Sequence, residues 1–375
     1  MIYFDSAATT LQKPASVARQ TAHAMSVMAS PGRGGHAAAM RAADAVFQCR
    51  QLAAELFAAQ PEQVCFTLNA THGLNIAIHS LVQPGDRVVI SGFEHNAVTR
   101  PLYAIGAQTV VAGTELFRPQ TTLEAFDRAV TSDTAAVIVN HVSNVFGYIQ
   151  PIEEIADLCR ERKVPLIVDA SQSAGALSVR TDRLGAAFIA MPGHKGLYGP
   201  QGTGLLICTR LPKPLMQGGT GSMSAMQQMP SFLPDRVEAG TPNVPGICGL
   251  GEGLRYVRRR KPETILAHEQ ALKNVLVREL APLAGVRLFT GSEGTQSGVL
   301  SFCIDGMDCE EAAAKLAQSA MAVRAGLHCA PLAHACAGTL ESGTIRASFS
   351  DFNTPEECRL FARRVRALLT EKRSR

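Results

Sequence analysis

The feature that most constrains the fold is an alternation of short apolar runs with helical patterns between about residues 60 and 210. Helical segments such as 74–81 and 152–163 keep their apolar residues on one face and lie between the runs. This alternation is typical of βαβ units, so we predict an α/β fold with a mostly parallel sheet flanked by helices. The predicted strands are 64–67, 87–91, 136–140, 166–169, 187–191 and 204–208.

The pattern changes after residue 210, because residues 211–248 are rich in Gly, Pro, Met and Ser and form a predicted loop region. A chain of 375 residues is longer than one compact core usually needs, so we expect two domains. Further elements predicted after the loop are helices at 249–260, 264–281 and 310–319 and a strand at 298–304. We expect an N-terminal segment that packs with the small domain, a large domain and a small α+β C-terminal domain, at 1–14, 15–249 and 250–375.

Composition excludes several classes of protein. Hydrophobic residues make up 46% of the chain and charged residues 18%, which is typical of a globular protein. The net charge is only +4, and the basic cluster at 258–261 lacks interleaved aromatic residues, so nucleic acid is not an expected partner. No apolar run is long enough to span a bilayer, so a membrane is not expected either.

The ten cysteines form no CxxC pair, and the N-terminus lacks a basic stretch followed by an apolar one. We therefore expect reduced thiols in a cytoplasmic protein. The spacing of His328, Cys329, His334 and Cys336 fits no standard zinc pattern, so no metal site is predicted.

A lysine follows the predicted strand at 187–191, in the sequence Gly193-His194-Lys195-Gly196. In a polar pocket such a lysine can lose its proton and form a Schiff base with an aldehyde cofactor. Lysines near strand ends are usually surface residues, so this segment alone does not decide between the two interpretations.

Pyridoxal phosphate (PLP) is an aldehyde cofactor that would need four further groups, and the chain has candidates at successive strand ends. Thr71 and the free amides of a predicted helix start suit the phosphate, and Asp169 could keep the pyridine nitrogen protonated. His95 could stack on the ring, and Gln172 or Asn144 could donate to the ring hydroxyl. Each also has an ordinary interpretation as a helix cap, a surface residue or a partner of the backbone.

Ordered motifs run along nearly the whole chain, and together they resemble the class V aminotransferase family. Within it, the chain is most similar to the cysteine desulfurase and selenocysteine lyase group, which are PLP-dependent enzymes of fold type I. The motifs are Tyr3-Phe4-Asp5-Ser6-Ala7-Ala8-Thr9-Thr10, Glu94-His95-Asn96, His141-Val142-Ser143-Asn144, Val168-Asp169-Ala170-Ser171-Gln172-Ser173, Gly193-His194-Lys195, Glu238-Ala239-Gly240-Thr241-Pro242-Asn243 and Arg324-Ala325-Gly326-Leu327-His328-Cys329-Ala330.

The resemblance implies a role for each matching residue. It implies a homodimer with shared active sites, in which Thr241 reaches the phosphate bound by the neighbouring subunit. Two departures weaken the expected phosphate site, since Pro192 and Ala70 stand where relatives often carry hydroxyl residues. The implied roles within one subunit are the Schiff base at Lys195, ring stacking by His95, the pyridine partner Asp169, the ring-oxygen donors Gln172 and Asn144, and the phosphate site of Thr71, His72 and His194.

The resemblance also implies a sulfur-accepting nucleophile, Cys329. The preceding glycine suits a mobile loop, and Arg324 and His328 are expected to favour the thiolate by their positive charge. Arg346, together with Arg324 and Asn144, is expected to bind the substrate, because the paired donors of a guanidinium suit an α-carboxylate.

The function predicted from these residues is a PLP-dependent cysteine desulfurase. It would convert L-cysteine to L-alanine, with Lys195 and His95 moving protons and Cys329 taking the sulfur as a persulfide for a possible acceptor protein. A selenocysteine lyase acting on L-selenocysteine, or another class V β-lyase or aminotransferase, remains an alternative. So does a catalytically silent binding protein, whereas a dinucleotide-binding oxidoreductase lacks its Gly-x-Gly-x-x-Gly turn.

Overall fold

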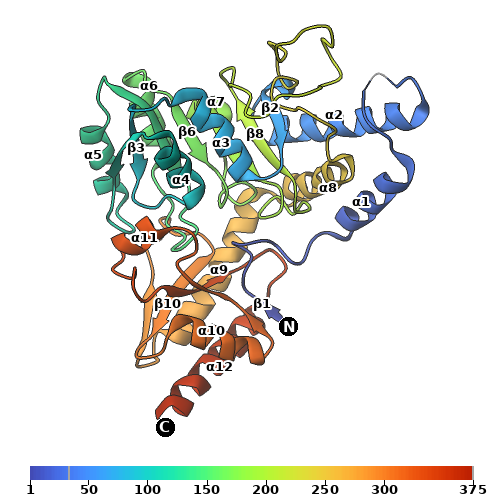
Figure 1. Cartoon of the computed structure of the whole chain (residues 1–375). Coiled ribbons are helices and arrows are strands. Elements are labelled where there is room, and N and C mark those ends of the chain that lie inside the picture. The colour runs from blue at the N-terminus through green and yellow to red at the C-terminus, as the bar shows by residue number, and fades with distance from the viewer. Residues whose placement is uncertain (33, 374–375) are drawn as a thin grey trace.

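The computed structural model describes residues 1–32 and 34–373, and its backbone is organised around two main sheets (Figure 1). The larger sheet has seven strands and the smaller has four. In Figure 1 the larger sheet and its helices fill the upper part of the view, and both chain ends lie in the lower part with the smaller sheet. No helix in the described ranges combines the length and the apolar character that crossing a membrane requires.

The seven strands of the larger sheet are arranged in the order β2-β8-β7-β6-β5-β3-β4. β8 runs antiparallel to both of its neighbours, and every other neighbouring pair is parallel. The predicted mostly parallel sheet is therefore confirmed. The strands are β2 (Val64–Thr67), β3 (Arg87–Ser91), β4 (Gln108–Ala112), β5 (Thr134–Asn140), β6 (Leu166–Asp169), β7 (Phe188–Pro192) and β8 (Gly204–Cys208).

The central strands of this sheet are buried on both faces, which explains their nearly continuous apolar sequences. Along β3, Val89 belongs to one hydrophobic core while Val88 and Ile90 belong to another, as the two-residue period of a strand requires. Helices α2, α5, α6 and α8 contribute to the first core, and α3 and α4 to the second. The helices are α1 (Ala15–Val27), α2 (Ala37–Phe57), α3 (Ala70–Leu81), α4 (Asn96–Ile105), α5 (Pro119–Ala129), α6 (Ile152–Glu161), α7 (Thr181–Leu184) and α8 (Val244–Arg260).

The smaller sheet is antiparallel and has the order β12-β13-β10-β9. One separate hydrophobic core lies between this sheet and helices α9, α10 and α12. The strands are β9 (Val286–Phe289), β10 (Val299–Ile304), β12 (Arg324–Gly326) and β13 (Thr344–Ser348). The helices are α9 (Pro262–Leu280), α10 (Cys309–Gln318), α11 (Pro331–Cys336) and α12 (Pro355–Arg373).

The N-terminal segment lies against this C-terminal part of the chain. β1 (Ile2–Tyr3) pairs in parallel with β11 (Met321–Ala322), and Asp5 forms a bridge with Ser348. Phe4 is fully buried in the core of the smaller sheet. The division of the chain into domains at residues 14 and 249 stays a prediction.

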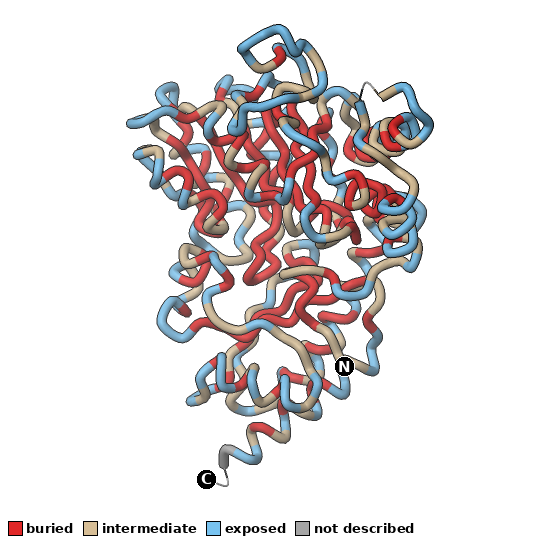
Figure 2. The backbone as a smooth tube through the Cα atoms, turned by 45° about the vertical axis from the view of Figure 1, so that its right-hand side comes forward, coloured by how far each residue is buried: buried red, intermediate tan, exposed pale blue. Residues whose placement is uncertain are grey.

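Buried positions follow the central strands of both sheets, whereas the segment between β8 and α8 is largely exposed from residue 209 to 232 (Figure 2). This segment contains no helix or strand, in agreement with the predicted loop region. Large apolar side chains are exposed along it, at Leu211, Leu215, Met216, Met223, Met226 and Phe232.

The turns that follow β6 and β7 touch each other where Gly175 meets Gly196. Gly175 has a φ of 94°, and a Cβ atom on it would lie 2.1 Å from the carbonyl oxygen of Gly196. Only glycine satisfies both the left-handed backbone and the close approach. Because Lys195 immediately precedes Gly196 and Asp169 ends β6, this contact helps to set the spacing between the two side chains.

We expect Gly175→Ala to lower the free energy of unfolding by about 3 kcal/mol, because the new methyl group adds a backbone clash to an unfavourable φ. The control is Gly106→Ala, where φ is 78° but a Cβ atom would meet nothing within 4 Å. That variant should lose only about 1 kcal/mol. Urea unfolding followed by circular dichroism measures both, and equal losses would contradict the role of the contact.

Candidate active site

A cavity opens at the carboxyl edge of the larger sheet and encloses about 510 Å³ of space, part of it continuous with solvent. In a mostly parallel sheet, ligands bind beyond this edge because the strand ends and the following turns meet there. The structure brings seven of the predicted residues together around the cavity. They are Thr71, His95, Asn144, Asp169, Gln172, His194 and Lys195.

Lys195 lies in the turn after β7, and its side chain lines the cavity. Burial lowers the pKa of this lysine from 10.5 to about 8, with the nearby Asp169 opposing the shift and Arg346 adding to it. A larger fraction of Lys195 is therefore unprotonated near neutral pH than is usual for a lysine. This is the state in which an amine reacts with a carbonyl group.

Asp169 is the last residue of β6 and is buried. One of its carboxylate oxygens, Oδ1, accepts a hydrogen bond of 2.9 Å from the amide of Ser171. The strand pairing places Asp169 opposite Ala190 of β7, two residues before that strand ends. The acid is thereby fixed at the edge from which the Lys195 turn begins.

His95 precedes α4 and caps its first turn, because its Nδ1 atom accepts from the amide of Ala97 at 3.0 Å. Burial lowers the pKa of His95, and the nearby Asp169 partly opposes this shift. An accepting Nδ1 means that the neutral ring carries its proton on Nε2. The ring lines the cavity, and its stacking on a cofactor stays a prediction.

The first turn of α3 supplies the candidate anion site. Asn69 caps the helix by accepting from the amide of His72 at 2.9 Å, while Ala70 and Thr71 line the cavity. Amides in the first turn of a helix have no intrahelical partner and attract anions. Pro192, the other departure from the family pattern, also lines the cavity.

Two predicted cofactor residues lie outside this cavity in the chain. His72 and Thr241 both line a second cavity, together with Glu238 and Gly202. The Nδ1 atom of His72 accepts from the amide of Leu68 at 3.3 Å. Thr241 is exposed and does not line the cavity that contains Lys195.

The N-terminal segment contacts the cavity, which the sequence analysis did not predict. Gln172 donates its Nε2–H to the carbonyl oxygen of Ala7 at 2.9 Å. The Nδ1 atom of His194 lies 3.1 Å from Thr9 Oγ1, and Thr10 Oγ1 donates to the carbonyl oxygen of His194 at 3.0 Å. Burial, aided by Lys195, lowers the pKa of His194 to about 4, so this ring is neutral at physiological pH. The hydroxyl-rich motif at residues 6–10 was the available sequence signal.

Cys329 is exposed on a loop that is held at the edge of the site. His328 and Cys329 both have left-handed backbone angles, with φ of 50° and 55°. The carbonyl oxygen of Cys329 accepts from the amide of Asn96 at 2.7 Å, and that of His328 accepts from Asn144 Nδ2 at 2.8 Å. The first contact attaches the loop to the residue that follows His95.

The predicted positive charge of His328 is wrong. Burial, together with the nearby Arg346, lowers the pKa of His328 to about 2, so the ring is neutral at physiological pH. Its Nδ1 atom lies 3.3 Å from Nε2 of His334, and its Nε2 atom lies 3.3 Å from the carbonyl oxygen of Arg324. His328 therefore orients the loop and does not favour the Cys329 thiolate through a charge.

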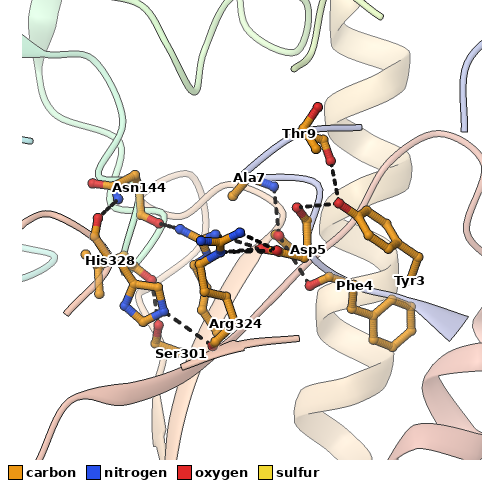
Figure 3. Close-up of polar contacts among 12 residues, drawn as sticks. Tyr3, Phe4, Asp5, Ala7, Thr9, Asn144, Ser301, Arg324 and His328 are labelled. Carbon is orange, nitrogen blue, oxygen red and sulfur yellow. Dashed lines mark hydrogen bonds and ion pairs between the residues drawn. The ribbon is translucent and has the colours of Figure 1, made fainter. Parts of the chain in front are cut away.

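The two arginines predicted to bind substrate converge on Asp5 (Figure 3). Nη2 of the buried Arg346 lies 2.9 Å from Asp5 Oδ1, and its Nη1 donates to the carbonyl oxygen of Asn144 at 2.9 Å. Arg324 is more exposed, and its Nη2 lies 3.1 Å from Asp5 Oδ2. The structure thus connects the predicted carboxylate site to the N-terminal segment.

The chain is similar to known proteins over nearly its whole length. The model of the family described as "Aminotransferase class-V" matches residues 2–361. A probable cysteine desulfurase of Methanothermobacter thermautotrophicus is 31% identical, over 96% of this chain and 92% of the relative. A probable cysteine desulfurase of Mycolicibacterium paratuberculosis is 35% identical over 98% of this chain, which spans only 55% of that relative's length.

Two solved structures of cysteine desulfurases resemble the chain closely. One, from Thermococcus onnurineus, superposes with a TM-score of 0.89 at 29% identity, over 99% of this chain and 95% of that one. The other, CsdA from Escherichia coli, has a TM-score of 0.85 at 26% identity, over 98% of this chain and 94% of that one. The predicted fold type I architecture is confirmed by these likenesses. The chain belongs to the aminotransferase class-V family.

Proposed function

We propose that this protein is a PLP-dependent cysteine desulfurase, which converts L-cysteine to L-alanine and takes the sulfur on Cys329. One observation carries the proposal. Cys329 is exposed, and its carbonyl oxygen accepts a hydrogen bond from the amide of Asn96, next to His95. The His95 ring lines the same cavity as Lys195 and Asp169. An aminotransferase needs the lysine and the acid, but it has no use for a thiol at this place.

The residues around the cavity fit PLP. Lys195 has a lowered pKa and suits the aldehyde of PLP. The buried Asp169 suits the pyridine nitrogen, and the first turn of α3 suits the phosphate. The Oδ1 atom of Asn144, a cavity residue, is buried without a hydrogen-bond partner within residues 1–32 and 34–373. Such an unpaired atom supports a bound polar group at this point. When bound, PLP supplies an electron-poor ring that stabilises negative charge on the substrate Cα.

The side chains around the cavity have distinct roles in the proposed reaction. The amine of Lys195 removes the proton from the substrate Cα. The Asp169 carboxylate would keep the pyridine nitrogen of PLP protonated. The neutral His95 has a protonated Nε2 and exchanges a proton with the substrate thiol. Arg346 holds the α-carboxylate, so that the substrate sulfur is directed toward Cys329.

Sulfur transfer then takes place between two sulfur atoms. The Cys329 thiolate attacks the substrate sulfur, an S–S bond forms and the Cβ–S bond breaks. The electron pair of the broken bond remains with the substrate Cβ, which gains the proton that His95 took from the substrate thiol. Lys195 returns a proton to Cα, and the product leaves as L-alanine. The persulfide on exposed Cys329 is accessible to a second thiol, which supports an acceptor protein as partner.

A homodimer and a cytoplasmic location belong to the same proposal. Within one chain, Thr241 is exposed and lies away from the Lys195 cavity. This placement supports its proposed contact with the phosphate in the neighbouring subunit. The apolar side chains exposed between residues 211 and 232 lie in the same connecting segment.

We expect Cys329→Ser to lower L-cysteine turnover by about 100-fold or more, because the nucleophile of the transfer step is lost. Alanine and sulfide release in the presence of a reducing thiol measures the effect. Cys336→Ser is the matched control, because Cys336 is half-buried and lies seven residues after Cys329 in the sequence. This replacement should leave turnover unchanged. A Cys329→Ser variant with full activity on L-cysteine would overturn the proposal, whereas activity on L-selenocysteine alone would favour a selenocysteine lyase.

We expect Lys195→Gln to raise the free energy of unfolding of the PLP-free protein at pH 7 by about 2 kcal/mol, while abolishing turnover. Burial lowers the pKa of Lys195 to about 8, so the unfolded chain holds this proton more tightly than the folded one. The resulting penalty is fully present below pH 8 and disappears as the pH rises toward 10.5. Urea unfolding at pH 7 and pH 10 measures this difference.

The stabilisation by Lys195→Gln should therefore be much smaller at pH 10 than at pH 7. Lys213→Gln is the control, because Lys213 lies in an exposed segment and its replacement should leave stability unchanged at both pH values. Equal stabilisation at both pH values would contradict the lowered pKa.

A further inference from the structure

We propose that Asp5 is a positioning residue for the substrate: its carboxylate holds the Arg346 guanidinium in the orientation that receives the α-carboxylate. This inference rests on the proposed function and names a residue outside the cavity lining. Asp5 acts through Arg346. Replacing Asp5 should therefore weaken binding of the substrate carboxylate and change the rate of the chemical step much less.

The described contacts of Arg346 leave its Nε–H group without a partner. The residue is 2% exposed, and two of its three side-chain nitrogens are bonded, Nη2 to Asp5 Oδ1 and Nη1 to the carbonyl oxygen of Asn144, both at 2.9 Å. The third nitrogen, Nε, is buried and has no hydrogen-bond partner in the part of the chain that the structure describes. A guanidinium is planar, so fixing Nη1 and Nη2 also fixes the direction of the Nε–H bond.

The charges around Asp5 also suit an incoming anion. Arg346 and Arg324 share the single carboxylate of Asp5, so the three side chains keep one positive charge in excess (Figure 3). A substrate carboxylate would neutralise this excess. Without Asp5, Arg346 would be buried with no ionic partner, which is unfavourable and removes the reason for its orientation.

Asp5 is itself held through its backbone. The Tyr3 hydroxyl donates to the carbonyl oxygens of Asp5 and Thr9, at 3.3 and 2.8 Å. Asp5 bridges Ser348 of β13, and the Ser348 hydroxyl accepts from the amide of Ala7 at 2.9 Å. The backbone position of Asp5 is therefore fixed independently of the two arginines that its carboxylate contacts.

The test is Asp5→Asn, which keeps the shape of the side chain and removes its charge. We expect KM for L-cysteine to rise at least about tenfold, with a much smaller change in kcat. Isothermal titration calorimetry provides a second measurement that needs no turnover. Binding of L-alanine should weaken by the same factor, whereas binding of ethylamine, which is alanine without its carboxylate, should stay unchanged.

Tyr3→Phe is the matched control, because it removes contacts that hold the same segment and leaves the charge of Asp5 in place. It should leave KM unchanged, because the bridge between Asp5 and Ser348 still holds the backbone of Asp5. The proposal is overturned if Asp5→Asn leaves KM unchanged or lowers it, if Tyr3→Phe raises KM equally, or if ethylamine binding weakens as much as alanine binding.

If Asp5→Asn does not fold, Asp5→Glu decides the question. The longer side chain keeps the charge but moves the carboxylate, so KM should rise with kcat retained, and an unchanged KM overturns the proposal. Failure of the proposed function is recognised separately. A wild-type protein without desulfurase activity would refute that function, while the comparison of alanine with ethylamine would still test Asp5.

Discussion

The parallel pairing of β5, β6 and β7 is the constraint on which the candidate site depends. In register, Asn140 lies opposite Asp169, and Asp169 lies opposite Ala190, so the ends of three strands meet at one edge. The turn that carries Lys195 begins at that edge and is held against the turn after β6. Residues distant in the sequence therefore come together because their strands are hydrogen-bonded in order.

Positive charge in this region resides on arginine and lysine and not on histidine. Burial lowers the pKa of His194 to about 4 and that of His328 to about 2, so both rings are neutral at physiological pH. Arg346 remains charged although burial lowers its pKa, because a guanidinium has an intrinsically high pKa and Asp5 lies beside it. Small pH changes near neutrality thus leave the protonation states of His194, His328 and Arg346 unaltered, whereas the protonation of Lys195 responds to them.

Most of the larger sheet could be predicted from the sequence, because its central strands are buried on both faces and read as apolar runs. β4 was missed, since it is an edge strand in which Ala112 is the only fully buried residue of five. Among the helices, α9 and α10 lie within two residues of their predicted bounds. α8 begins five residues earlier than predicted, at Val244 after a capping Asn243 in the Pro- and Gly-rich region.

The site was partly predictable for a similar reason. Asp169 ends a strand, Lys195 and His95 come shortly after one, and strand ends can be recognised in a sequence. The contact of Asp5 with Arg346 joins residues 341 positions apart, which no local pattern indicates. The charge of His328 depends on its burial among other elements, so the motif around Cys329 gave the wrong expectation.

The distribution of the cysteines has a consequence for how the protein would respond to electrophiles and oxidants. Seven of the ten thiols are buried, and burial raises the pKa of Cys49, Cys159 and Cys358 to about 12. Cys329 alone among the ten is exposed. Alkylating agents and peroxide would therefore modify a single position first, so that chemical damage begins at the proposed nucleophile and leaves the fold intact.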